Sequence, residues 1–321
     1  MTTPDLLGKI LQVVMGLVVL AAVVGLLIFF IDKAPKKGRD YWQLALFLLP
    51  AMLFVAIGLV YPAIRTSFLA FQNNAGEWSL DNFVWMFTQP AAIRTLINTV
   101  LWVALAPVIS TVIGLAYAVF IDKSRGEKYY KVILFMPIAI SFVGAGVIWG
   151  FVYDYNGVGD QIGLLNAIVV AFGGEPIPWL TTSPINIFCE ILILVWLQTG
   201  FAMVVLSAAI KGVPGELLEA ARLDGATERQ VFLGIIVPMI RGSIITVATT
   251  IAIVTLKIFD IVYVTTGGRF NDDVVAVRMF HEIFQFFNDG RGAALATLLF
   301  LGVLPVMYIN LRNFRRQQRE A

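Results

Sequence analysis

Seven long apolar stretches alternate with polar segments along the chain. A helix needs about 20 mostly apolar residues to cross the hydrocarbon core of a bilayer. The stretches of about this length are residues 10–31, 43–64, 98–121, 132–153, 186–210, 240–264 and 293–311. The pattern predicts an all-α polytopic membrane protein with about seven transmembrane helices.

The first stretch has an alternative explanation as a secretory signal. Its basic residues, beginning at Lys33, follow the apolar run instead of preceding it, and no A-x-A-like cleavage site follows. The run is also longer than the apolar region of a signal peptide. We therefore expect a retained helix.

Lysine and arginine are concentrated in alternate loops, and this bias predicts the orientation of the chain. The loops 32–41, 122–131 and 211–241 and the tail each hold four cations. These are Lys33, Lys36, Lys37, Arg39; Lys123, Arg125, Lys128, Lys131; Lys211, Arg222, Arg229, Arg241; and Arg312, Arg315, Arg316, Arg319. The other segments together hold six, namely Lys9, Arg65, Arg94, Arg269, Arg278 and Arg291. The asymmetry predicts an N-terminus outside and a C-terminus in the cytoplasm.

Three outer segments are expected to lie along the membrane surface. Residues 162–172 are apolar but too short to cross. Residues 79–95 mix aromatic and polar side chains, and residues 272–290 place apolar side chains at helical spacing. We expect an interfacial or re-entrant helix over 162–172, an outer surface position for 79–95 and an amphipathic helix over 272–290.

The composition supports a membrane protein and excludes several functions. Of 321 residues, 59% are hydrophobic and 14% are charged, whereas a soluble domain carries about 25% charged residues. The net charge of +2 gives no field that would recruit nucleic acid. Cys189 and His281 are the single cysteine and histidine, so thiolate clusters and histidine-rich metal sites are excluded, and no metal site is predicted.

The cytoplasmic loop 211–241 carries the clearest local signals. Pro214 ends one span and opens a short helix, and Asp224–Gly225 indicates a turn. Thr227 with Gln230 three residues later matches a capping box. The pattern predicts two short helices that bend at Gly225 and lie at the membrane surface.

Two interpretations of this loop remain open. It could simply connect two spans. Alternatively it docks a partner: Leu217 and Leu218 would insert into a groove, Ala220 and Ala221 would allow close approach, and Glu219 would pair with a basic residue.

The order of residues in this loop resembles the EAA loop of ABC importer permeases. The resemblance rests on Glu219-Ala220-Ala221, then Gly225, then Ile235-x-Val237-Pro238. The family pattern usually ends in Leu-Pro, so Val237 is a conservative departure. The resemblance extends over residues 42–320 and is strongest to carbohydrate-uptake permeases. Within these, the chain is similar to the larger membrane subunit of maltose transporters and most similar to bacterial α-glucoside permeases.

This resemblance implies a domain organisation and a set of partners. Residues 1–41 would form a peripheral helix and basic loop, 42–93 a second span and outer segment, 94–311 the type I permease core, and 312–321 a basic tail. The implied partners in the bacterial inner membrane are a second permease subunit, two ATPase subunits and an extracytoplasmic sugar-binding protein. The chain itself would bind no cofactor, because ATP and Mg belong to the ATPases.

The same resemblance suggests where sugar passes. Trp196 matches a sugar-site tryptophan, while Gln198, Phe201 and Thr255 fall on further sugar-site positions, and Ser141 lies one residue from another. An aromatic face with amide and hydroxyl groups suits a pyranose ring. Polar groups inside a membrane cost free energy, so a functional role is the first hypothesis for them. Each of these residues could instead serve helix packing or an interhelical hydrogen bond.

Lys257 and Asp260 stand three residues apart in the sixth stretch, which predicts a mutually neutralising pair on one helix face. Alternatively, Lys257 or Asp260 lines the cavity or lies at its outer gate. Cys189 is expected to pack within a span, and His281 to be a polar position on the outer helix.

Other function classes fit the sequence less well. No G-x-x-x-x-G-K-[ST] motif is present, so energy must come from another chain. A membrane-embedded transferase would have to use Asp154 and Asp160, which lie in a turn-like loop. An autonomous carrier has no use for a docking loop. Within importers, we expect an α-glucoside such as trehalose, sucrose or maltose; glycerol-phosphate is the rival, although it would need more intramembrane cations than Lys257.

Overall fold

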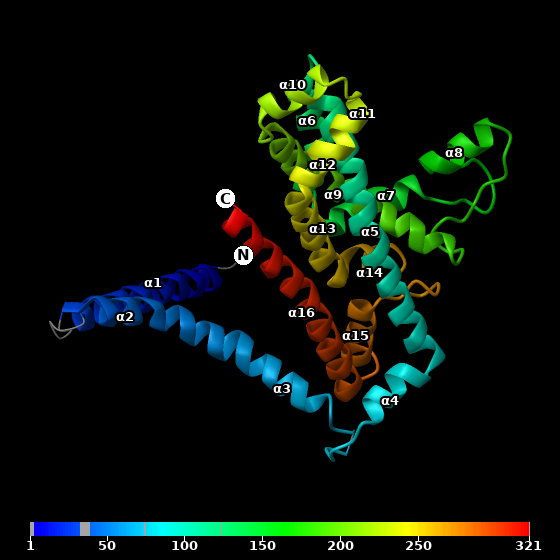
Figure 1. The fold of residues 1–321 in the computed structure, drawn as a ribbon. Helices are drawn as coiled ribbons and strands as arrows, with labels where there is room; N and C mark the ends of the chain where they lie inside the picture. Colours follow the sequence, from blue (N-terminus) through cyan, green and yellow to red (C-terminus); the bar gives the residue numbers. More distant parts are fainter. Residues whose placement is uncertain (1–2, 33–38, 74, 123, 321) are drawn as a thin grey trace. The chain divides into compact units, whose positions relative to one another are not determined.

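The computed structural model describes residues 3–32, 39–73, 75–122 and 124–320. All regular elements in these ranges are helices (Figure 1). The α-helices are α1 (Thr3–Asp32), α2 (Arg39–Val55), α3 (Tyr61–Leu69), α4 (Asp81–Thr88), α5 (Pro90–Asp122), α6 (Glu127–Phe135), α7 (Phe142–Val152), α8 (Leu164–Ala171), α9 (Ile185–Lys211), α10 (Gly215–Leu223), α11 (Glu228–Val231), α12 (Val237–Met239), α13 (Arg241–Leu256), α14 (Asp260–Thr265), α15 (Val275–Phe284) and α16 (Asp289–Glu320). Short π or 3₁₀ turns continue them at η1 (Ala56–Val60), η2 (Met136–Ala139) and η3 (Phe232–Ile236). The predicted loop cations Lys33, Lys36, Lys37 and Lys123 lie outside the described residues.

The chain divides into two compact units, residues 1–65 and 66–321. The first unit contains α1, α2, η1 and the beginning of α3. Its apolar side chains are widely exposed, and none of the described side chains of residues 41–65 is buried. Such a surface suits contact with lipid or a partner chain, not with water.

The second unit holds the hydrophobic core, where α5, α9 and α13 pack together. Trp102 of α5, Leu194 of α9 and Ile251 of α13 are fully buried. The backbones of α5 and α9 approach closely at Gly114, where an added Cβ would lie 2.5 Å from the Cβ of Ala202. Small residues allow such close packing between membrane helices.

Among the residues that the structure describes, four helical segments are long and apolar enough to span a membrane: residues 41–69, 90–122, 185–211 and 289–313. The number of possible spans rises to six if each of two bent helix pairs crosses the membrane as one span. The predicted span 132–153 is such a pair, bent by 103° between η2 and α7, and the helices around 240 bend by 66°. The predicted continuous helices over 132–153 and 240–264 are therefore wrong, because the backbone breaks near Ser141 and again at Lys257.

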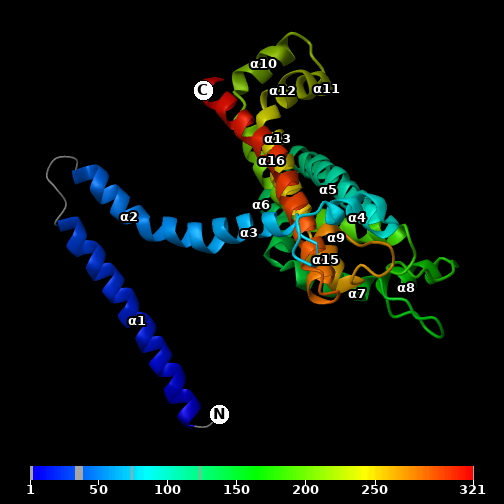
Figure 2. The same ribbon diagram turned by 90° about the horizontal axis from the view of Figure 1, so that it is seen from below.

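The helices predicted within residues 162–172 and 272–290 are present, and residues 79–95 also contain a short helix. α4, α8 and α15 fall within residues 79–95, 162–172 and 272–290. α8 and its flanking loops extend sideways from the bundle in both views (Figures 1 and 2). Asn166 connects α8 to its flanking loops. Its amide donates to the carbonyls of Asp154 and Ile177, and its oxygen accepts from Trp179 Nε1 at 3.0 Å.

Candidate functional site

The loop 211–241 consists of α10 and α11 joined at a glycine. Gly225 has φ +85°, a left-handed conformation that glycine adopts at little cost. Thr227 accepts a hydrogen bond from the backbone N–H of Gln230, and the Gln230 side chain accepts from the Thr227 N–H at 2.8 Å. The bend and the capping box are confirmed.

The side chains predicted to meet a partner remain accessible on this loop. Leu217, Glu219, Ala220 and Pro238 are exposed, whereas Leu218 and Ala221 are half-buried. Leu217 is 47% exposed, and its neighbour Leu223 is 88% exposed. α10 therefore presents apolar and acidic groups together at one end of the second unit, opposite α15 (Figure 1).

Regular backbone connects the loop to a membrane helix. α11 continues through η3 into α12, and one bend of 66° separates this segment from α13. Arg222 pairs with Glu228 at 2.7 Å, which fastens α10 to α11 across the turn. A displacement of α10 can therefore reach α13 through the short turn at residues 224–227, the helical segment from α11 to α12 and the bend at Ile240.

An ionic network lies where the loop leaves α9. Lys131 Nζ lies 2.8 Å from Asp122 and 2.7 Å from Glu127, and it also bonds to Ser207. Ser207 donates to Asp122 at 2.6 Å, and Lys211, the last residue of α9, bonds to Glu127. The network joins the ends of α5, α6 and α9 directly before α10 begins.

Trp196 belongs to an aromatic cluster between α7 and α9. Its half-buried ring lies 5.8 Å from that of Trp149, edge to face, and Trp149 lies 5.2 Å from Tyr153. The Tyr153 hydroxyl donates to the carbonyl of Cys189 at 3.0 Å. The sequence analysis missed Trp149 and Tyr153, although their i, i+4 spacing would place them on one helix face.

The other predicted pathway residues differ in their surroundings. Gln198 is 8% exposed, and Phe201 packs partly buried against the cluster around Met203. Thr255 is fully buried and donates to the carbonyl of Ile251. Ser141 is exposed and caps α7 by accepting from Gly144 N–H. The hydroxyls of Thr255 and Ser141 thus already have local partners, which agrees with the packing alternative.

The structure reveals unpaired donors on α5 that the sequence analysis missed. Trp102 Nε1, Ser110 Oγ and Thr111 Oγ1 are buried without a hydrogen-bond partner in the described structure. An unpaired buried donor costs about 1–3 kcal/mol. These few polar residues lie in an apolar run. Their spacing shows no period that would distinguish them from ordinary residues of a membrane span.

Two relatives show to which family the chain belongs. The chain is 45% identical to the osmoprotective compounds uptake permease protein GgtC of Synechocystis over 277 residues, which cover 85% of this chain and 99% of GgtC. It is 46% identical to the alpha-glucoside transport system permease protein AglF of Rhizobium meliloti over 276 residues, 85% of this chain and 82% of AglF. The chain belongs to the sugar-uptake permeases of ABC transporters. No protein-family profile matches it.

A solved structure shows that the permease has the fold of this class. It superimposes with a TM-score of 0.73 on a chain of a bacterial alginate ABC transporter in complex with an alginate-bound periplasmic protein. The two chains are 22% identical, and the match covers 88% of the permease and 96% of the other chain.

Lys257 and Asp260 do not share a helix face in the permease. α13 ends at Leu256 and α14 begins at Asp260, so Lys257 and Asp260 belong to different segments. The described residues show no ion pair between them, and Lys257 is exposed while Asp260 is half-buried. The prediction of one helix face is wrong because the non-helical residues Lys257–Phe259 change the direction of the chain.

A buried polar cluster holds the first turns of α9 in the permease. Glu190 is fully buried and accepts hydrogen bonds from Thr265 at 2.6 Å and Thr266 at 3.2 Å. Asn186, one turn earlier, donates to the buried Asp272 at 2.9 Å. Nothing in the sequence linked Thr265 and Thr266 to Glu190.

Proposed function

We propose that this chain is the translocating subunit of an importer for an α-glucoside or related disaccharide. Separate ATPase subunits would drive it through the loop 211–241. The observation that carries the coupling proposal is the exposed surface of Leu217, Glu219 and Ala220 on α10, next to a glycine bend of defined geometry. The sugar class rests on the identity to the alpha-glucoside permease AglF.

The assembly would place this chain in the bacterial inner membrane with seven crossings. Its N-terminus would lie outside and its C-terminus in the cytoplasm, as the alternation of cationic loops predicts. A second permease subunit would complete the pathway, two ATPases would hold ATP and Mg, and an extracytoplasmic protein would deliver the sugar. This chain would perform no catalysis.

Coupling would work by rigid-body movement. Closure of the ATPases would displace α10, and the bent segment from α11 to α13 would transmit that displacement to the bundle. Alternating access needs two packings of this kind that a ligand or a motor can bias. Gly225 fixes the angle between α10 and α11, and Glu219 would anchor the contact.

Sugar would pass along α9. Trp196, supported by Trp149, would supply an aromatic face. Gln198 would offer an amide, Phe201 a second ring, and Thr255 and Ser141 hydroxyls if their local hydrogen bonds open.

Co-purification and stimulation of ATP hydrolysis test this function. A tagged ATPase subunit should retain the permease in detergent, and sugar-loaded binding protein should stimulate ATP hydrolysis by the reconstituted complex. A panel of trehalose, sucrose, maltose and glycerol-phosphate would identify the substrate. Retention without stimulation by any disaccharide would contradict the sugar class, and transport by the purified chain alone would contradict the coupling.

An osmoprotective solute is the second candidate. It rests on the 45% identity to GgtC, whose name refers to osmoprotective compounds and 99% of which aligns with this chain. The same panel distinguishes the candidates when polyol and glucoside osmolytes are added. Uptake that rises only with these solutes, in cells under osmotic stress, would favour the second candidate.

A further inference from the structure

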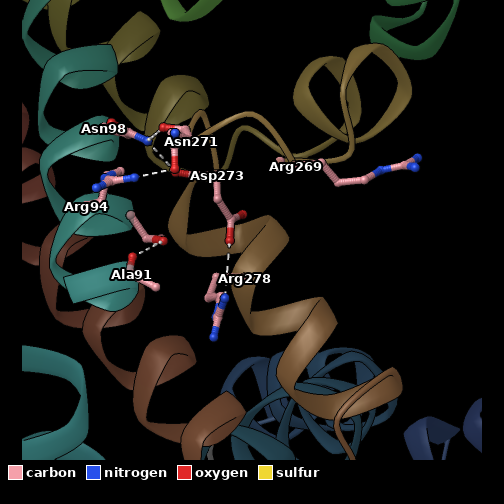
Figure 3. Close-up of a pocket in the computed structure, with 9 residues that line it drawn as sticks. Ala91, Arg94, Asn98, Arg269, Asn271, Asp273 and Arg278 are labelled. Atoms are coloured by element: carbon pink, nitrogen blue, oxygen red, sulfur yellow. Dashed lines mark hydrogen bonds and ion pairs between the residues drawn. The ribbon is translucent and has the colours of Figure 1, made fainter. Parts of the chain in front are cut away.

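A polar pocket of about 200 Å³ lies at the end of the second unit opposite α10 (Figure 3). The first turns of α5 form one wall, and the segment 268–273 with α15 forms the other. Asn98 donates to the backbone carbonyls of Asn271 and Asp273 at 2.8 and 2.9 Å, and Arg94 bonds to the Asn271 side chain. The pocket is thus held open by hydrogen bonds between two distant parts of the sequence.

The pocket carries uncommitted positive charge. Its lining contains three arginines and one aspartate. Arg278 is already engaged, because it lies 2.7 Å from Glu282 and 4.0 Å from Asp273. Arg94 and Arg269 are exposed and have no acidic partner among the described residues. Arg269 stands at the rim, where its side chain points away from the others (Figure 3).

The position along α5 places the pocket outside the hydrocarbon core. Arg94 precedes Asp122 by 28 residues of one helix, a rise of about 42 Å. The hydrocarbon core is about 30 Å thick, and about 40–45 Å with the headgroups. In the proposed orientation Asp122 lies at the cytoplasmic boundary. Arg94 then reaches the outer edge of the headgroups, where water-soluble partners approach.

We propose that this pocket receives an aspartate or glutamate side chain of the extracytoplasmic sugar-binding protein. Arg94 is the main charged contact and Arg269 a second one at the rim. The proposal rests on the proposed function and adds to it the residues and the chemistry of the outer contact. An arginine fork binds a carboxylate through two parallel hydrogen bonds, which fixes the orientation of the partner as well as its position.

The charge of the pocket agrees with an acidic partner. Arg278, which lines it, stacks on Trp85 at 5.6 Å from the ring centroid. Complementary charge speeds the encounter of two proteins and fixes their register. A lipid phosphate has similar chemistry and lies close to this height, so the experiment below distinguishes it from a protein carboxylate.

The test measures how tightly the complete importer binds its delivery protein. The importer is reconstituted in nanodiscs, and sugar-loaded binding protein of the same uptake system is titrated while ATP hydrolysis is measured. Arg94→Gln combined with Arg269→Gln should raise the half-saturating concentration of binding protein at least tenfold. The rate at saturation should stay within twofold, because the pocket does not touch the ATPases.

Matched variants separate recognition from general damage. Arg291→Gln removes a neighbouring outer cation that does not line the pocket, and it should change the half-saturating concentration less than twofold. Arg94→Lys should be intermediate, because it keeps the charge but loses the fork. Raising the salt concentration should weaken the wild type more than the double variant.

Each outcome has one meaning. If the wild type is stimulated and the double variant has the same half-saturating concentration, the pocket proposal is wrong while the importer function stands. If the wild type shows no stimulation, the proposed function itself fails. If the defect appears only in nanodiscs that contain phosphatidylglycerol and not in pure phosphatidylcholine, the occupant is a lipid headgroup, which overturns the proposal.

Discussion

Glu219 is the residue whose exposure most directly predicts a partner. It stands beside the exposed Leu217 and Ala220 on α10. We expect Glu219→Lys to reduce ATP-driven sugar uptake more than tenfold, because the new cation would face a basic residue of the ATPase. The amount of permease in the membrane should not change. Glu216→Lys, one turn earlier and also exposed, is the control and should retain most of the uptake. Equal uptake by both variants would remove Glu219 from the docking surface.

Of the residues proposed to line the sugar pathway, Trp196 has the best geometric support. Its ring meets Trp149 edge to face, and such pairs contribute about 0.5–1.5 kcal/mol beyond their buried area. We expect Trp196→Ala to lower sugar uptake at least fivefold while the complex with the ATPases still assembles. Trp196→Phe should recover part of the uptake because it keeps an aromatic face. Unchanged uptake by Trp196→Ala would exclude this residue from the pathway.

Asp273, in the wall of the outer pocket, makes stability depend on pH. Burial raises the pKa of its carboxyl to about 7, although the nearby Arg278 acts in the opposite direction. The folded state therefore holds the proton more tightly than the unfolded state. The contribution of Asp273 to stability falls as pH rises from about 4, near its ordinary pKa, to about 7.

Asp273→Asn should remove this dependence. We expect the melting temperature of the variant relative to wild type to be higher at pH 8 than at pH 5, measured in detergent by intrinsic fluorescence. The free-energy difference should not exceed about 4 kcal/mol. A constant offset between the two proteins over this range would show that Asp273 has an ordinary pKa.

At the scale of elements, the ionic network holds three helix ends under the coupling loop. Lys131 contacts Asp122, Glu127 and Ser207. We expect Lys131→Met to destabilise the permease by about 1–3 kcal/mol, because it leaves partly buried polar groups unpaired. Lys128→Met, an exposed neighbour on α6, should cost little. Thermal unfolding measured by light scattering and fluorescence compares them, and equal melting temperatures would show that the network adds no stability.

The elements that the sequence predicted correctly depend on local signals. Gly225 and the Thr227–Gln230 box determine a bend and a helix start within a few residues, so both could be derived without knowledge of the fold. The apolar runs likewise located α5, α9 and α16. The family resemblance added the EAA loop and the importer class, which no periodicity could provide.

The missed features depend on contacts between distant parts of the chain. A broken span keeps the same hydropathy as a continuous one, so the breaks near Ser141 and Lys257 were invisible to a count of apolar residues. Glu190 meets Thr265 and Thr266 across 75 and 76 positions of sequence. Likewise Arg94 meets Asn271 only because α5 and the segment 268–273 fold together. Sequence spacing carries no information about such contacts.

At the scale of the whole molecule, α5 links the two surfaces that contact partners in our proposals. Its first turns line the outer pocket with Arg94 and Asn98, and its last residue, Asp122, joins the network next to α10. Close packing against α9 at Gly114 couples this helix to the pathway residues along its length. A displacement at either end of α5 therefore acts on one helix. This suits the proposed importer, in which binding of the delivery protein at one end must be coupled to ATP hydrolysis at the other.

We expect the first helix to be separable from this arrangement. Residues 1–65 form their own compact unit, and 85% of this chain is enough to cover 99% of GgtC. We therefore expect a chain without residues 1–41 to insert, to assemble with the ATPases and to transport sugar within about twofold of wild type. Uptake per assembled complex, with the amount quantified by a C-terminal tag, measures this. A matched chain without residues 42–93, which removes α4 and the Trp85 contact to Arg291, should fail to assemble. Loss of ATPase binding in the shorter deletion would show that α1 is part of the core.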